Sequence, residues 1–277
     1  MLPGVKRIAL FAVFALLSCQ QRHEDPAYVQ EITKWQTNRA ARLKAEDGWL
    51  SLVGLQWLNP AENKLEGFGT FTLHDGKVTY VPAAGGAPQE LRDDTDPNGP
   101  TLLQQGTKRV TVIKRNEKLG LRIKDANSPA RTHFLGLDYF PVNSQWRFVA
   151  RFEPYNPPKK LPITNVLGMV SEETSPGLLA FDVDGKTYKV EPILEQGETD
   201  WFIIFKDATS GKETYGAARY VYAAPPGPDG TTVLDFNKAY NPPCAFTPYA
   251  TCPLPPPQNK LPFRVEAGEK KYRGSEH

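Results

Sequence analysis

The chain of 277 residues is long enough for one large domain or two small ones, and it has 33 basic against 31 acidic residues. With 40% hydrophobic and 11% aromatic residues, its composition is that of a globular protein and not of a disordered one. The formal charge of +2 excludes the basic excess of a general nucleic-acid binder, so we expect no nucleic-acid partner. The sequence has no Rossmann glycine fingerprint, P-loop, nucleophile elbow or HExxH motif, and we expect no cofactor.

The first 19 residues, MLPGVKRIALFAVFALLSC, have the features of a bacterial export signal. Lys6 and Arg7 precede an apolar segment, 8–17, which is too short to span a bilayer, since a spanning helix needs about 20 residues. The segment ends in Leu-Leu-Ser-Cys, which resembles the lipoprotein box in which the cysteine, here Cys19, becomes the first mature residue and carries the lipid. The alternative is an ordinary secretory signal with an incidental cysteine. We expect a lipoprotein-type signal peptide over 1–18 and a polar tether over 19–25.

The residue after Cys19 and the charge of the mature chain bear on where the protein is held. Gln20 is not the aspartate that favours retention in the inner membrane, so we expect an exported lipoprotein of the outer membrane that faces the periplasm. Residues 1–18 hold two basic and no acidic residues, which makes the mature chain neutral. Bulk charge would not hold such a chain on a membrane, and attachment is expected through the lipid anchor.

A helix is predicted from Pro26 to about Gly48. Asp25 is a good N-cap, Pro26 suits the first helical position, and Gly48 is a plausible stop. The residues of one helix face recur at a spacing of three or four and are Val29, Ile32, Gln36, Ala40 and Leu43. The charged residues of the segment are expected in solvent.

From residue 49 onward the pattern is that of short strands. The apolar run 48–58 is predicted to enter the core, and hairpin turns are predicted at 75–76, 116–117 and 184–185. Further strands are predicted at 147–153, 201–205 and 215–222. We therefore expect a mainly β protein: a barrel-like or sandwich body of short antiparallel strands with one N-terminal helix. Residues 26–277 are expected to form a single domain, with a sub-division near 156–158 as the natural seam.

The last third of the chain is rich in proline. Residues 225–262 hold 11 of the 26 prolines, but the segment also carries aromatic residues, so we expect an ordered loop and not a linker. Strand alternation over 233–238 places Asp235 and Asn237 opposite Leu234 and Phe236. This polar face is either part of a site or an Asp paired with a buried cation such as Arg219, beside a turn-capping Asn.

This segment also carries a resemblance to a known family. The run DFNKAYNPPCAFTPYATCPLPPPQNKLPFRVEAGEK, 235–270, resembles the C-terminal signature of the bacterial domain of unknown function 1684 family. The segments 48–58, 134–142 and 207–220 are similar to other landmarks of that family, so the resemblance runs from about Trp35 to Tyr272. The family has no established activity, and the resemblance implies a place to look for a site and not a mechanism.

Cys244 and Cys252 lie within the signature, and three interpretations remain open. In an oxidising envelope a disulfide is favoured, and closing the nine-residue loop would stabilise the fold by about 2.5 kcal/mol. A metal pair is disfavoured because the spacing is not that of a zinc knuckle, and His74 and His133 are expected to be strand residues. A catalytic thiol would need a nearby base.

Two groups of acidic residues have both a structural and a functional interpretation. The run Asp94, Asp96, Asn98 matches the opening of a calcium loop, but Gln105 replaces the twelfth-position glutamate, so an ordinary turn is favoured and no metal is expected. Glu269, with Glu266, lies near Arg264 and Lys270, and a charged strand end is favoured over an acid–base pair.

The candidate binding or catalytic residues lie in the last third of the chain: Arg219, Asp235, Asn237, Tyr240, Asn241, Asn259 and Glu269. The sequence favours a lipid-anchored envelope protein that binds a small molecule or an envelope polymer, or that has a structural role. The alternative is a hydrolytic enzyme that uses Cys244 or the Asp235/Asn237 face. An enzyme requires Asp235, Arg219, Asn241 and a cysteine in one cleft, whereas a structural module would separate them or bury them as pairs.

Overall fold

The computed structural model describes residues 24–195 and 197–274. The predicted signal peptide, Cys19 and most of the tether lie outside these residues. The fold is mainly β, with several antiparallel sheets and one long N-terminal helix, as predicted. Within the described residues no helix is both long and apolar enough to cross a bilayer.

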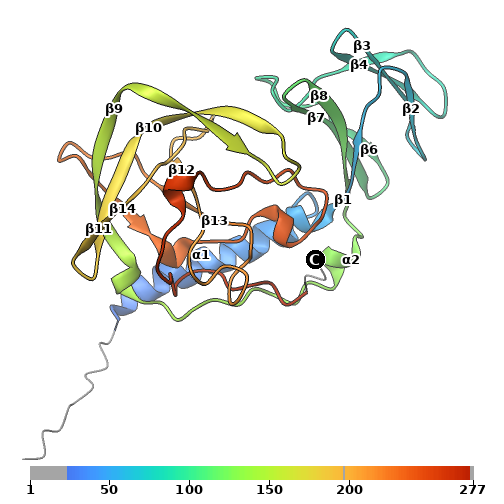
Figure 1. The fold of residues 1–277 in the computed structure, drawn as a ribbon. Coiled ribbons are helices and arrows are strands. Elements are labelled where there is room, and N and C mark those ends of the chain that lie inside the picture. The colour runs from blue at the N-terminus through green and yellow to red at the C-terminus, as the bar shows by residue number, and fades with distance from the viewer. Residues whose placement is uncertain (1–23, 196, 275–277) are drawn as a thin grey trace, which may run out of the picture.

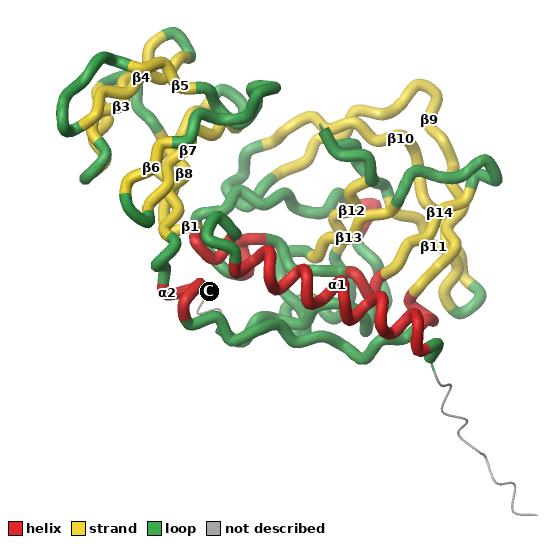
Figure 2. Tube along the Cα trace, turned by 180° about the vertical axis from the view of Figure 1, so that it is seen from behind, coloured by secondary structure: helices red, strands yellow, loops and turns green. Residues whose placement is uncertain are grey.

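The N-terminal helix α1 (Pro26–Lys44) begins where the sequence predicts, because the Asp25 carboxylate accepts a hydrogen bond from the Ala27 backbone N–H at 2.9 Å. Its buried residues are Ile32 and Leu43, as the helical spacing predicts, and also Arg39, which the charge pattern had placed in solvent. Figure 2 shows α1 running along the larger part of the molecule beside β12 and β13.

The larger part, which we call the body, contains residues 24–51, 126–195 and 197–274. Its main sheet has the order β11-β10-β9-β14, and two further strands form a separate pair. The strands are β9 (Arg147–Thr164), β10 (Val170–Val183), β11 (Lys186–Val190), β12 (Trp201–Phe205), β13 (Arg219–Ala223) and β14 (Thr231–Asp235). The long strands β9 and β10 arch over β12 and β13 as a half-barrel (Figure 1). β9 continues through 156–158, where the sequence suggested a seam.

Residues 52–125 form a second part, the β1–β8 lobe, which stands to one side of the body (Figure 1). It has two antiparallel sheets, ordered β1-β8-β7-β6 and β2-β3-β4-β5, and a hydrophobic cluster of its own. Its strands are β1 (Leu52–Trp57), β2 (Glu62–Leu65), β3 (Gly69–His74), β4 (Lys77–Pro82), β5 (Gln89–Leu91), β6 (Leu103–Gln105), β7 (Lys108–Arg115) and β8 (Lys118–Asp125).

The three predicted hairpins are confirmed. Asp75, Asn116 and Asp184 have φ values of 49°, 51° and 49°, the left-handed conformation that a two-residue hairpin turn needs and that short polar residues tolerate. These turns join β3 to β4, β7 to β8 and β10 to β11.

The proline-rich C-terminal segment is ordered and largely buried, as predicted, and it crosses the body as a series of turns. Tyr240 pairs with Tyr220 of β13 through two backbone hydrogen bonds of 2.9 Å, and this anchors the segment to the core. The remaining helical elements are short: α2 (Pro129–Thr132) and 3-10 turns at Trp49–Ser51, Ser144–Trp146, Phe236–Lys238, Pro243–Ala245 and Pro257–Asn259.

Candidate functional site

A cleft of about 1330 Å³ is lined by α1, the body and the β7–β8 hairpin of the lobe. The hairpin touches the body at its tip, where the Asn116 side chain donates a hydrogen bond to the Val170 carbonyl at 2.9 Å. Beside it, Arg115 Nε donates to Thr251 Oγ1 at 3.1 Å. The cleft therefore has one wall from the lobe and one from the body, and its shape depends on both.

The basic wall of the cleft is centred on Arg122 of β8. The guanidinium lies over the Trp49 ring at 5.2 Å, and its Nε is buried with no hydrogen-bond partner among the described residues. Burial, followed by repulsion from Arg115, lowers the pKa of Arg122 to about 10, so the group stays charged at neutral pH. Arg115 itself is paired with Asp94 at 2.9 Å, whereas Arg122 has no ion pair in residues 24–195 and 197–274.

Aromatic rings form the floor of the cleft on the body side. Tyr222 of β13 stacks between Phe202, at 5.0 Å, and Tyr240, at 6.4 Å between ring centroids. The guanidinium of Arg39 lies 4.6 Å from the centroid of the Tyr240 ring. These stacked rings make a rigid apolar surface that also has hydroxyl groups.

The carboxyl group of Glu195 lies beside this aromatic surface. The Tyr222 hydroxyl donates a hydrogen bond to its Oε2 at 2.5 Å. Burial raises the pKa of Glu195 above the ordinary 4.5, and the charges of Glu198 and Glu173 raise it further, while the Tyr222 hydrogen bond opposes them. All three carboxyl groups line the cleft, so the cleft has a negative region as well as a basic wall.

Two of the seven candidate binding or catalytic residues, Asp235 and Tyr240, line the cleft. The carboxylate of Asp235 accepts hydrogen bonds from the Tyr28 hydroxyl and the Asn237 backbone N–H, each at 3.0 Å. The predicted two-faced strand is wrong beyond Asp235, because β14 ends there and the chain enters a 3-10 turn that Asp235 caps. Asp235 and Asn237 are buried, as Leu234 and Phe236 are.

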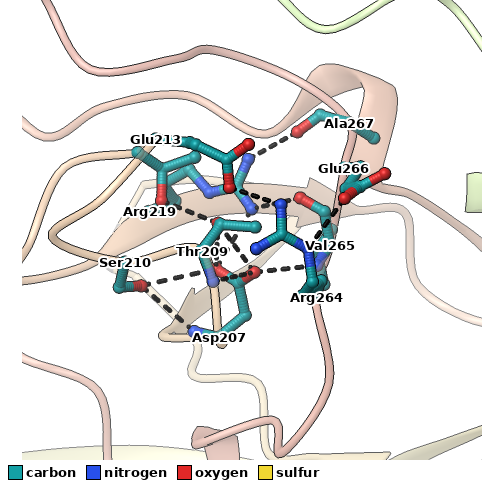
Figure 3. A network of polar contacts seen from close by, with 10 residues as sticks. Asp207, Thr209, Ser210, Glu213, Arg219, Arg264, Val265, Glu266 and Ala267 are labelled. Atoms are coloured by element: carbon teal, nitrogen blue, oxygen red, sulfur yellow. Dashed lines mark hydrogen bonds and ion pairs between the residues drawn. The ribbon is translucent and has the colours of Figure 1, made fainter.

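Arg219, which the sequence offered as one possible cation for Asp235, has a different partner. Its Nη2 lies 3.2 Å from Asp207 Oδ1 and donates to the Val265 carbonyl at 2.8 Å, while Nη1 donates to the Ala267 carbonyl. Asp207 also accepts hydrogen bonds from the Thr209 hydroxyl at 2.8 Å and the Val265 N–H at 2.8 Å (Figure 3). This buried network joins the segment after β12 to the C-terminal segment and does not line the cleft.

Glu269 and Asn241 belong to a second buried network, behind the cleft. Arg39 Nε lies 3.0 Å from Glu269 Oε1, the Asn241 N–H donates to Glu269 Oε2 at 2.9 Å, and Arg39 Nη2 donates to the Asn241 carbonyl at 2.9 Å. The prediction of a charged strand end is therefore wrong for Glu269, which is fully buried. Arg264 and Glu266 do form an exposed charged pair, with side chains 2.7 Å apart, but they lie in a loop and not at a strand end.

Asn259 fastens the C-terminal segment to the body and is not part of the cleft. Its amide nitrogen donates to the carbonyls of Glu191 and Ile204, each at 2.9 Å, and its oxygen accepts from the Glu191 N–H at 2.6 Å. These bonds satisfy the backbone of two neighbouring segments, and the side chain is completely buried.

The favoured disulfide is absent from the structure, in which Cys244 and Cys252 are free, buried thiols. The Cys244 N–H donates to Cys252 Sγ at 3.1 Å, and the Cys244 thiol donates to the Ala250 carbonyl at 3.5 Å. Only Cys252 lines the cleft, and burial raises the pKa of its thiol. Neither His74 nor His133 lines the cleft.

The acidic run of the lobe forms a turn. Asp96 accepts a hydrogen bond from the Asn98 N–H at 2.8 Å, while Asp94 accepts from the Lys114 N–H at 2.8 Å and pairs with Arg115. In the described part of the chain no three His, Cys, Asp or Glu side chains are grouped as metal ligands would be.

A known protein family matches the part of the chain that forms most of the body side of the cleft. A family model described as "Protein of unknown function (DUF1684)" matches residues 132–270, just over half of the chain. The chain belongs to the DUF1684 family. The DUF1684 match includes Glu195, Tyr222 and Tyr240, whereas Arg39, Trp49 and Arg122 precede it.

The solved structures that are similar to this DUF1684 chain include one described as an uncharacterized protein. It is a protein of Haloarcula marismortui solved by NMR in solution, with 30% sequence identity and a TM-score of 0.44. The similarity covers 52% of this chain and 81% of the other. No curated protein matches the chain.

No motif in the sequence marks the cleft residues Arg122, Trp49, Glu195 and Tyr222. In β8 the apolar residues Leu119 and Leu121 belong to the lobe's own core, so their alternation indicates only that Arg122 lies on the opposite face. Nothing in the local pattern of the lobe indicates that this face meets Trp49 from the N-terminal segment.

Proposed function

We propose that the protein is a lipid-anchored envelope protein that binds a small organic anion in the cleft between its lobe and body. The observation that supports this most strongly is Arg122, whose charged group is partly buried at the cleft, lies over an aromatic ring and forms no ion pair among the described residues. Asp94, whose charge also acts on Arg122, is paired with Arg115. The lipoprotein-type N-terminus supports the anchored, exported part of the proposal.

An unpaired cation in a desolvated position is costly to the fold. Transfer of a charged group out of water without a partner costs several kcal/mol, so buried guanidinium groups are nearly always paired. The two arginines that are buried in the described residues are paired, Arg39 with Glu269 and Arg219 with Asp207. A bound carboxylate or phosphate would supply the missing hydrogen-bond acceptors of Arg122, and guanidinium groups bind both in a bidentate manner.

Binding fits the cleft better than hydrolysis by a thiol. Cys252 lines the cleft, but its raised pKa keeps it protonated, and no histidine among the described residues lines the cleft to act as its base. The Asp235 carboxylate is occupied by Tyr28 and Asn237. Arg219 and Asn241 are held in the buried networks, so the convergence that the enzymatic alternative requires is not formed.

The test is a titration of the full-length chain with sodium benzoate and with phenyl phosphate, followed by tryptophan fluorescence, with benzyl alcohol as the neutral analogue. We expect both anions to bind at least tenfold more tightly than the alcohol. Arg122→Gln should weaken anion binding about tenfold or more, equivalent to about 1.4 kcal/mol.

The matched control is Arg109→Gln, because Arg109 lies on neighbouring strand β7 but pairs with Glu46 and does not line the cleft. It should bind the anions like the unmodified protein. Equal affinity for the anions and the alcohol, or undiminished anion binding by Arg122→Gln, would contradict the proposal.

A further inference from the structure

The cleft has an unpaired carboxyl group as well as an unpaired cation. Glu195 accepts a hydrogen bond from Tyr222 and forms no ion pair within the described residues. The two charged residues that act on its carboxyl group, Glu173 and Glu198, are also acidic and repel it. Among the described residues neither Arg122 nor Glu195 forms an ion pair, and the two residues line the same cleft from the lobe and from the body.

From this geometry we infer that the ligand is a short peptide with free ends. Its carboxylate would pair with Arg122, its ammonium group would pair with Glu195, and the residues between would pack on the Tyr222 and Tyr240 rings. One such molecule satisfies both unpaired groups, and neither a simple anion nor a simple amine does so. The inference rests on the proposed function, because it assigns to Arg122 the same anion-binding role.

The size of the cleft agrees with a peptide and exceeds the needs of a single amino acid. Its volume of about 1330 Å³ is above the range of roughly 300–1,000 Å³ that is usual for small-molecule pockets. The body side of the cleft also includes Phe202, which stacks on Tyr222. Stacked rings of this kind contact apolar side chains and peptide planes while their hydroxyl groups remain available for hydrogen bonds.

The protonation state of Glu195 should make peptide binding depend on pH. An ammonium group pairs with the ionised carboxylate and not with the protonated acid. The groups that influence this carboxyl are Tyr222 on β13, Glu173 on β10, and Glu198 in its own loop, while Asp200 also lines the cleft. Because burial raises the pKa of Glu195, peptide binding should weaken as the pH falls toward that raised pKa, before an ordinary glutamate would be protonated.

The experiment uses three mixtures of random-sequence tripeptides that differ only at their ends: free at both, N-acetylated, or C-amidated. Retention of each mixture by the immobilised full-length chain is measured by mass spectrometry at pH 7. We expect retention of the free peptides and at least a tenfold loss with either cap. Glu195→Gln should remove the difference between free and N-acetylated peptides, and the control Glu172→Gln, an exposed residue outside the cleft, should preserve it.

The outcomes separate the two proposals. If N-acetylated and free peptides are retained equally, and the loss on C-amidation remains, the peptide inference is overturned while the anion site of Arg122 stands. If the three mixtures are not retained but benzoate still binds through Arg122, the inference fails and the proposed function survives. If neither peptides nor benzoate bind, both fail. The circular dichroism spectrum of each variant verifies that it is folded.

Discussion

Arg39 and Glu269, which are 230 positions apart, form a buried ion pair of 3.0 Å that joins the N-terminal helix to the C-terminal segment. The same guanidinium donates to the Asn241 carbonyl and lies over the Tyr240 ring, so one side chain connects the buried network to the floor of the cleft. The position of α1, and with it the α1 side of the cleft, depends on this pair.

Arg39→Met should destabilise the protein by about 3–5 kcal/mol, because it leaves the Glu269 carboxyl buried without its cation. Arg39→Lys should restore only part of this, since an ammonium group cannot reproduce the planar guanidinium that reaches both Glu269 and Asn241 and stacks on Tyr240. Urea unfolding measures both changes. Arg42→Met is the control on an exposed position of the same helix, and an Arg39→Met variant as stable as that control would contradict the expectation.

Asp207→Asn should lower the free energy of unfolding more than Asp235→Asn does, although both aspartates are buried. Asp207 pairs with the fully buried Arg219, and the change would leave that cation unpaired at about 3–5 kcal/mol. Asp235 accepts hydrogen bonds from the neutral Tyr28 hydroxyl and the Asn237 amide, so Asp235→Asn should cost about 1–2 kcal/mol. Urea unfolding of the two variants side by side tests the order, and a reversed order would refute these assignments.

Cys244 and Cys252 should be detected as two thiols and not as a disulfide. Both are buried, so in the folded protein they should react slowly with iodoacetamide and rapidly once the chain is unfolded in urea. Mass analysis without reductant then shows two added groups on the peptides that contain them. A mass 2 Da lower with no added groups, which is the mass of hydrogen lost on oxidation, would restore the disulfide that the sequence favoured.

Glu195→Gln should stabilise the protein more at pH 7 than at pH 4. Burial raises the pKa of Glu195, so between the ordinary value and the raised one the unfolded chain loses this proton while the folded chain keeps it. Above the raised pKa the folded protein carries the full cost of a desolvated carboxylate, and glutamine removes it while preserving an acceptor for Tyr222. Unfolding at the two pH values, with Glu172→Gln as the control, measures the difference, and a pH-independent effect would argue against it.

Cys19→Ala should release the protein from the membrane while leaving it exported. The mature chain is neutral, so without the acyl chains bulk charge does not hold it on lipid. Metabolic labelling with a radioactive fatty acid should mark the unmodified protein and not the variant. Equal membrane retention of the two proteins would rule out anchoring through Cys19.

Local sequence patterns were sufficient for much of the fold. The cap of α1 by Asp25 and the turns at Asp75, Asn116 and Asp184 could be predicted, because each depends on the conformational preference of residues that are adjacent in the chain. The ordered state of the proline-rich segment could also be predicted from its aromatic residues, which need a core to pack in.

The partners of charged residues were not predictable in this way. Arg219 and Asp235 were expected to pair, but Arg219 binds Asp207, twelve positions before it, and Asp235 meets Tyr28, 207 positions before it. Strand alternation also failed at Asn237, where a side-chain cap turned the chain into a 3-10 helix. Period-2 and period-3.6 patterns identify the buried face of an element but not the element that covers it.

The sequence by itself determined the class of the fold, the start of the helix, the hairpins and the family, because turn conformation, capping and alternation are properties of neighbouring residues. Only the tertiary structure brought Arg122 of the lobe over Trp49 and placed Glu195 beside Tyr222. In the sequence pattern one arginine or glutamate looks like another. A charged side chain becomes a desolvated, unpaired group at a cleft only when segments distant in the sequence pack around it and exclude water.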